Sequence, residues 1–205
     1  MKIQIFIDTI CGWCFIGSQR LQSVLHKLRD DYEIIYVPFQ LNPHMPLEGM
    51  NRVDYVTSKF GSIENAQDMY DNMVQQSKQE NLQFKLEKIK RTPNTVLSHI
   101  LIDLARHTNK QKEIVFEIFS NYFIEGMDIG DMNNLIKIGT NHGIKKDILI
   151  SEFQSKKSRE KVERMDTIGR KMGITGVPFY VFNEKILISG AQPQDALLKA
   201  IEDSK

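Results

Sequence analysis

Two short apolar segments near the start of the chain have the pattern of β-strands. Residues 2–8, KIQIFID, partly alternate apolar and polar side chains and are rich in isoleucine and phenylalanine, which is typical of a strand. Residues 33–39, EIIYVPF, are apolar and β-branched, and Pro38 predicts that pairing stops near that end. Between them, apolar residues at helical spacing predict a helix with one buried stripe: Leu21, Val24, Leu25 and Leu28.

A long middle segment has the periodicity of helices. Residues 41–49, LNPHMPLEG, predict a loop because proline and glycine interrupt them, and residues 51–155 have a helical pattern throughout. Thr92 and Pro93 have the residue types of a helix cap and first turn, and Asp131 has those of another cap. Three apolar stripes run through this segment: Ile63, Ala66, Tyr70, Met73 and Val74; Val96, Leu97, Ile100, Leu101, Leu104 and Ala105; and Ile114, Val115, Ile118, Phe119, Tyr122 and Phe123.

The last quarter of the chain returns to a mixed pattern. Ser158 predicts the start of a helix. Residues 178–182, PFYVF, and 185–189, KILIS, predict two strands of a hairpin that turns at Asn183-Glu184. Pro193 opens a final helix.

The order of these elements predicts an α/β protein with the thioredoxin fold. Strand, helix and strand come first, and helix, strand, strand and helix come last, which is the thioredoxin order once the middle segment is removed. That segment, roughly a hundred residues, is far longer than a loop of a compact domain. We therefore expect a discontinuous thioredoxin-fold domain, residues 1–40 and 156–205, with an inserted all-helical subdomain, residues 41–155.

Charge and hydropathy argue against several classes of function. The net charge is +1, from 27 basic and 26 acidic residues, so nothing indicates a nucleic-acid partner. The apolar runs are too short to span a bilayer, so no membrane association is expected. The opening MKIQIFIDTI lacks the long apolar segment of a signal peptide, which predicts a cytoplasmic protein.

The only two cysteines, Cys11 and Cys14, form the sequence CGWC between the first predicted strand and helix. Because the cytosol keeps most thiols reduced, a pair at this spacing favours dithiol redox chemistry. Unpaired N–H groups at the start of a helix stabilise an anion, so Cys11 is expected to attack as a thiolate. Cys14, one turn later and pointing inward, is expected to resolve the mixed disulfide formed at Cys11.

Other roles of a CxxC pair have less support. Two buried, unreactive cysteines would not need a strand-to-helix junction. Asp8 is expected to cap the helix, with proton acceptance from Cys14 as the alternative, and Trp13 is expected to form an apolar lip, with packing against the insertion as the alternative. A structural zinc site needs four ligands, and no metal is expected because none of the histidines has a paired metal spacing: His26, His44, His99, His107 and His142.

The segment TGVPFYVF, residues 175–182, carries a second chemical signal. A proline that begins a strand after a glycine-containing turn is a place for a cis peptide bond, although trans is the commoner state. In a thioredoxin fold this loop faces the two cysteines, so the Val177–Pro178 bond is expected to be cis. Val177 would then offer its N–H and C=O groups to the extended backbone of a peptide or of glutathione.

Together these motifs resemble the DsbA-like thioredoxin-fold superfamily, and within it the FrnE-type branch, which is related to 2-hydroxychromene-2-carboxylate isomerases and kappa-class glutathione transferases. The resemblance implies that Cys11 and Cys14 are catalytic and that Pro178 is a cis-proline. It also implies that Asn94, His99 and Gln192 face the active-site groove beside Gly12, Trp13 and Val177, although the apolar pattern around His99 alone favours a core position. The motifs that carry it are CGWCFIG (11–17), PFQLNPHMP (38–46), PNTVLSH (93–99), GITGVPFYVF (173–182) and ISGAQP (188–193).

The resemblance also separates the candidate reactions. Isomerase and transferase relatives typically have serine where Cys11 stands, so Cys11 favours thiol–disulfide exchange on protein or small disulfides, with glutathione as a redox partner and no bound cofactor. The alternatives are a glutathione-dependent isomerase or transferase on small aromatic substrates, for which Cys14 would be dispensable, and a non-catalytic binding module. Gly12 replaces the proline usual in the family and leaves the redox poise open. A homodimer is suggested by the resemblance alone.

Overall fold

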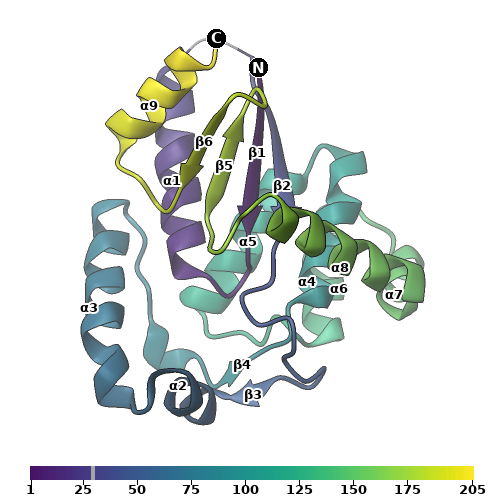
Figure 1. Ribbon diagram of the computed structural model, residues 1–205. Coiled ribbons are helices and arrows are strands. Elements are labelled where there is room, and N and C mark those ends of the chain that lie inside the picture. Colours follow the sequence, from purple (N-terminus) through teal and green to yellow (C-terminus); the bar gives the residue numbers. More distant parts are fainter. Residues whose placement is uncertain (29–30) are drawn as a thin grey trace.

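The computed structural model describes residues 1–28 and 31–205 and is built around one four-stranded sheet (Figure 1). The strand order is β2-β1-β5-β6. The parallel pair consists of β1 (Lys2–Ile7) and β2 (Glu33–Pro38), whereas β5 (Phe179–Phe182) runs antiparallel to both β1 and β6 (Ile186–Ser189). This is the sheet of the thioredoxin fold, so the expected fold class is confirmed.

Helices cover both faces of the sheet (Figure 1). On one face, α1 (Gly12–Lys27) and α9 (Gln194–Asp203) pack over the alternate residues Ile3, Ile5 and Ile7. On the other face lies α8 (Lys156–Lys171), whose Gly169 approaches the ring of Phe6. The period-two alternation of β1 therefore divides its side chains between two cores.

Residues 50–92 of the insertion lie beyond the end of the sheet at which β1 leads into α1, and residues 96–123 pack beside β2 (Figure 1). The helical character of the insertion is as expected, with one local difference: Met50 and Thr92 pair in a two-residue antiparallel ribbon. No helix within the described residues is long and apolar enough to cross a membrane. The elements of the insertion are β3 (Met50–Asn51), α2 (Arg52–Phe60), α3 (Ile63–Gln79), a 3₁₀ turn (Leu86–Lys88), β4 (Arg91–Thr92), α4 (Val96–Ala105), a second 3₁₀ turn (Arg106–Thr108), α5 (Gln111–Phe123), α6 (Met132–Asn141) and α7 (Lys146–Gln154).

The thioredoxin part and the insertion share a continuous hydrophobic core. Its central contact is Phe15 of α1, the residue after Cys14, which is 3% exposed. The Phe15 ring stacks on Phe119 at 5.1 Å and on Phe84 at 5.6 Å between ring centroids. Because aromatic burial contributes strongly to packing, this contact fixes the insertion against the helix that carries both cysteines.

Two helix starts differ from the sequence prediction. Helix α4 begins at Val96 rather than after Thr92, because Thr92 belongs to β4 and the Val96 N–H donates to Asn94 Oδ1 at 3.0 Å. Helix α8 begins earlier than Ser158, because Ser155 is its N-cap and accepts the Ser158 N–H. The predicted cap at Asp131 is confirmed, since its side chain accepts two backbone N–H groups of α6.

The turn between β5 and β6 is also as predicted. Asn183 and Glu184 have φ angles of 48° and 59°, and the Lys185 N–H donates to Phe182 O at 2.9 Å. Positive φ at both central residues gives a type I′ turn, whose twist matches that of the two strands.

Candidate active site

Cys11 is the N-cap residue of α1 and lies where β1 gives way to the helix. Its Sγ accepts the Cys14 N–H at 3.2 Å, and its thiol donates to the carbonyl oxygen of Val177 at 3.4 Å. Both cysteines are free thiols. A sulfur in the N-cap position takes the place of the oxygen that usually accepts the first N–H groups of a helix, so the same N–H group can stabilise a thiolate.

Cys14 differs from Cys11 in its surroundings, since its side chain is completely buried. Burial raises the pKa of the Cys14 thiol well above its ordinary value, and the hydrogen bond and charge of Cys11 and the charge of Asp8 raise it further. The backbone of Asp8 acts in the opposite direction. Cys14 therefore holds its proton at neutral pH, which matches the division into an attacking Cys11 and a resolving Cys14.

The Val177–Pro178 peptide bond is cis, as the resemblance implies. The loop fits against α1 because residue 17 is glycine: a Cβ there would lie 2.2 Å from the Tyr180 hydroxyl oxygen and 3.0 Å from Pro178 Cγ. Within the described residues, the Val177 N–H donates no hydrogen bond. It is therefore free to bind the backbone of a substrate, next to the carbonyl that contacts Cys11.

Gly12, between the cysteines, has a packing role. A Cβ at this position would lie 2.3 Å from Met73 Sδ and 3.1 Å from the ring of Phe84. The insertion thus approaches the first turn of α1 more closely than a proline at residue 12 would allow without a shift of Met73.

The cap predicted for Asp8 is wrong, because Cys11 itself occupies the N-cap position. The Asp8 carboxylate is fully buried, and its Oδ2 accepts the Leu41 N–H at 2.7 Å. Its Oδ1 lies 3.4 Å from Nε2 of His99, which is also fully buried. Within the described residues, neither this Oδ1 nor either ring nitrogen of His99 makes a hydrogen bond. A buried carboxylate–imidazole pair, in which some atoms make no hydrogen bond within the described residues, thus lies beside the thiols.

The other predicted groove residues divide into two groups. Trp13 is partly buried and lines a cavity next to Cys11, so it combines both expected roles. Asn94 and Gln192 do not line that cavity, and a place for them in the active-site groove stays a prediction. The Asn94 side chain donates to Met45 O at 2.7 Å and accepts from Val96 N, and Gln192 Nε2 donates to Ser189 O at 2.8 Å. Each fastens a local turn.

The cavity next to Cys11 has a volume of about 240 Å³ and lies between α1 and the insertion. Sequence reasoning missed its far wall, where Arg52, Tyr55 and Lys59 extend from one face of α2. The i, i+3, i+7 spacing of two cations around a tyrosine was the available signal. The lining residues are Ile10, Cys11, Gly12, Trp13, Leu41, Arg52, Tyr55, Lys59, Phe60, Met69, Tyr70, Met73, Leu86 and Phe123.

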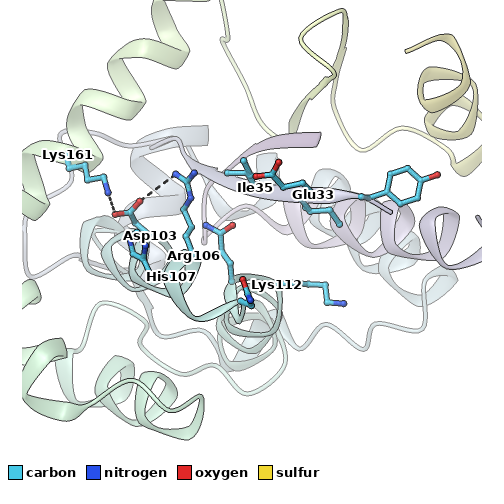
Figure 2. A pocket seen from close by; sticks show the side chains of 11 residues that line it. Glu33, Ile35, Asp103, Arg106, His107, Lys112 and Lys161 are labelled. Atoms are coloured by element: carbon cyan, nitrogen blue, oxygen red, sulfur yellow. Dashed lines mark hydrogen bonds and ion pairs between the residues drawn. The ribbon is translucent and has the colours of Figure 1, made fainter. Parts of the chain in front are cut away.

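A larger cavity, of about 600 Å³, lies away from the thiols beside the edge strand β2 (Figure 2). Figure 2 shows Asp103 between Lys161 and Arg106, with Glu33 and Ile35 on the neighbouring strand. Its side chains are mainly charged and polar, and neither cysteine lines it. In the part of the chain that the structure describes, no three His, Cys, Asp or Glu residues are grouped as metal ligands.

Comparisons with known proteins place this geometry in a family. The family model "DSBA-like thioredoxin domain" matches residues 2–202. An uncharacterized protein of Bacillus subtilis, YwbO, is 23% identical over 207 residues, covering 100% of this chain and 98% of that protein.

Solved structures share the fold. A probable DsbA oxidoreductase from Streptomyces coelicolor superposes with a TM-score of 0.87 at 24% identity, covering 100% of this chain and 89% of that one. A 2-hydroxychromene-2-carboxylate isomerase gives 0.76 at 12% identity, covering 99% and 95%. The cytosolic disulfide reductase DsbM from Pseudomonas aeruginosa, solved with GSH, gives 0.62 at 13% identity, covering 100% and 95%.

Proposed function

Because this chain belongs to the DSBA-like thioredoxin domain family, we propose that it is a thiol–disulfide oxidoreductase in which Cys11 attacks and Cys14 resolves. The observation that carries the proposal is the contrast between the two sulfurs. Cys11 accepts a helix N–H and contacts Val177, whereas Cys14 is buried and its pKa is raised. The FrnE-type branch stays a prediction.

The reaction has two exchanges. The Cys11 thiolate attacks one sulfur of a substrate disulfide, which forms a mixed disulfide and releases the other sulfur as a thiolate. Cys14 then loses its proton and attacks Cys11, so that the Cys11–Cys14 disulfide forms and the second substrate sulfur leaves. The substrate gains two electrons and the protein loses them. Two molecules of glutathione return the protein to the dithiol form and become glutathione disulfide; the same steps run backwards oxidise a substrate dithiol.

Asp8 is the group that accepts the Cys14 proton in this proposal. Its carboxylate is buried, one oxygen makes no hydrogen bond within the described residues, and its charge acts on Cys14. His99, 3.4 Å from that oxygen, helps to hold the carboxylate in place. A buried base of this kind speeds the resolving attack because a thiol must lose its proton before it can act as a nucleophile.

Glutathione and small or protein disulfides are the proposed partners, with no bound cofactor or metal. DsbM, which shares the fold, is named as a cytosolic disulfide reductase and was solved with GSH, and this supports both glutathione as a partner and a cytoplasmic location. The free N–H of Val177 suits the backbone of either partner. A homodimer stays a prediction from the resemblance.

A redox titration tests the proposal. The protein is equilibrated with a series of reduced-to-oxidised glutathione ratios, quenched in acid and alkylated, and its free thiols are counted by mass spectrometry. We expect a reversible Cys11–Cys14 disulfide with one defined midpoint, and a Cys14→Ser variant that instead retains glutathione on Cys11. If the wild-type protein forms no internal disulfide at any ratio, thiol–disulfide exchange is excluded. Full activity of Cys14→Ser on a small aromatic substrate would then favour a glutathione-dependent isomerase or transferase.

A further inference from the structure

The cavity next to Cys11 has walls suited to a small apolar molecule. Ligand sites for small molecules usually have volumes of roughly 300–1,000 Å³, so a cavity of about 240 Å³ suits a compact group. Trp13 and Cys11 form the wall on α1, and Met69, Met73 and Phe60 are among the side chains of the insertion that face them. Methionine and aromatic side chains adapt well to flat apolar rings.

Arg52 brings a positive charge into this apolar cavity and is held there by neutral groups. Its guanidinium lies 5.2 Å from the ring centroid of Tyr70 and 5.6 Å from that of Tyr55. Its two terminal nitrogens donate to the Tyr70 hydroxyl at 2.9 Å and to Thr92 Oγ1 at 3.2 Å. Arginine has five N–H donors in a planar fork, so donors remain for a ligand while the side chain is fixed.

Lys59 lies about two turns after Arg52 on the same face of α2. Its Nζ donates to the Tyr55 hydroxyl at 2.8 Å and to Asn42 Oδ1 at 3.3 Å, and lies 5.2 Å from the centroid of the Tyr55 ring. Tyr55, only 8% exposed, thus stands between the two cations and contacts both. The partly buried Arg52 and the exposed Lys59 thus both lie against the same tyrosine ring.

Within the described residues, no acidic side chain forms an ion pair with Arg52 or Lys59, although Asp71 and Glu87 line an adjoining cavity with Arg52. The lining of the cavity next to Cys11 contains no aspartate or glutamate. Arg20 of α1 is by contrast paired at 2.8 Å with Glu80, the C-cap residue of α3. A partly desolvated guanidinium without a counter-charge is stabilised when a carboxylate binds to its fork.

Resting on the proposed function, we infer that the preferred substrates are low-molecular-weight disulfides or thiols that carry a carboxylate on an apolar, aromatic body. The sulfur meets Cys11, the ring occupies the space between Trp13 and the methionines, and the carboxylate binds Arg52 and Lys59. The inference adds two specificity-determining residues from the insertion to the two cysteines.

Two chromogenic disulfides test this inference. Dithiobis(nitrobenzoate) carries a carboxylate on each ring and dithiodipyridine carries none, so the ratio of their rate constants with the reduced protein measures carboxylate recognition. We expect Arg52→Gln to lower this ratio roughly tenfold or more, since a hydrogen bond to a charged group is stronger than one to a neutral group. Lys59→Gln is expected to lower the ratio less. Arg52→Lys, which keeps the charge, is expected to retain part of the preference.

Matched exposed cations serve as controls. Arg164→Gln and Lys137→Gln remove the same charges outside the cavity and are expected to leave the ratio unchanged, which separates binding from long-range attraction. Circular dichroism and thermal unfolding check that each variant folds. An unchanged ratio in Arg52→Gln, or an equal change in the controls, would overturn the inference alone. If the reduced wild-type protein releases thiol from neither disulfide, the proposed function itself fails.

Discussion

Two cavities that contain cationic side chains, the one beside β2 and the one next to Cys11, differ in how those charges are balanced. In the larger one, beside β2, Asp103 lies 2.5 Å from Lys161 Nζ and 3.9 Å from Arg106 (Figure 2). In the smaller one, next to Cys11, Arg52 and Lys59 contact hydroxyl, amide and aromatic groups. Charges that a protein balances internally need no ligand, whereas unbalanced charges in an apolar space favour an anionic one.

The backbone groups beside the two cavities also differ in whether they have hydrogen-bond partners. Beside the larger cavity, Gln111 closes the edge of β2: its side chain accepts the Tyr36 N–H at 2.9 Å and donates to Tyr36 O at 3.1 Å. Beside the smaller cavity, the Val177 N–H makes no hydrogen bond within the described residues. The volume of a cavity is therefore a poorer guide to function here than the polar groups left without partners.

Arg20 extends the comparison, because it shows how much a cation with an internal ion pair contributes to stability. Its guanidinium binds Glu80, Gln76 and the carbonyl of Ala191, and thereby joins α1, α3 and the turn after β6. We expect Arg20→Met to lower the free energy of unfolding by about 3–5 kcal/mol, since Glu80, whose side chain is 10% exposed, would lose its charged partner and keep only the amide of Gln194. Urea unfolding followed by circular dichroism measures the change.

An exposed pair provides the control for Arg20. Lys110 and Glu113 form an ion pair at 3.2 Å on the surface of α5, and Lys110→Met is expected to cost less than about 1 kcal/mol. Equal losses of unfolding free energy in Arg20→Met and Lys110→Met would show that burial of the Arg20–Glu80 pair contributes nothing to stability.

Asp8 is the converse case, a buried carboxylate whose only ion-pair partner among the described residues is His99. We expect Asp8→Asn to slow the resolving step roughly a hundredfold at neutral pH, within the range of about 10²–10⁴ for a positioned base. Because burial raises the pKa of Cys14, the thiolate fraction grows as the pH rises, so the deficit should shrink toward alkaline pH. Rapid quenching in acid and mass spectrometry of the Cys11–glutathione mixed disulfide measure the step.

The outcome separates two roles of Asp8. The new asparagine can still accept the Leu41 N–H through its amide oxygen, so the loop after β2 keeps its anchor. If Asp8 acted only through its charge, its removal would lower the pKa of Cys14 and resolution would become faster. A faster variant would therefore exclude Asp8 as the proton acceptor.

The fold, the helix start at Cys11 and the cis peptide bond before Pro178 could be predicted from the sequence because their signals are local. Period-two and period-3.6 patterns identify the strands and helices, and the two cysteines and Val177–Pro178 belong to short motifs that lie next to the elements they join. The cap predicted for Asp8 failed because a neighbour competed for the same position: the sulfur of Cys11 accepts the N–H of Cys14, and the carboxylate turns inward.

The far wall of the cavity could not be predicted, because it depends on how the insertion packs. Arg52 and Lys59 are distant from Cys11 in sequence. Contacts between α1 and the insertion, among them those of Phe15, Met73 and Arg20, bring α2 and α3 to the thiols. The Asn94 side chain is likewise used locally, on the backbone of Met45 and Val96. Long-range packing, rather than local pattern, selects the residues that meet a substrate.

Substitution of Lys161 is expected to have the smallest effect, and it tests the comparison of the two cavities most directly. Its side chain is 47% exposed and Asp103 is 14% exposed, so the pair is partly screened by water. We expect Lys161→Gln to change the free energy of unfolding by less than about 1 kcal/mol and to leave the midpoint of the glutathione titration and both disulfide rate constants unchanged. Urea unfolding and the same two chromogenic disulfides measure these quantities. A shifted midpoint or an altered ratio of the two rate constants would mean that the cavity beside β2 acts on the thiols, and the distinction between balanced and unbalanced cations would then no longer locate the substrate.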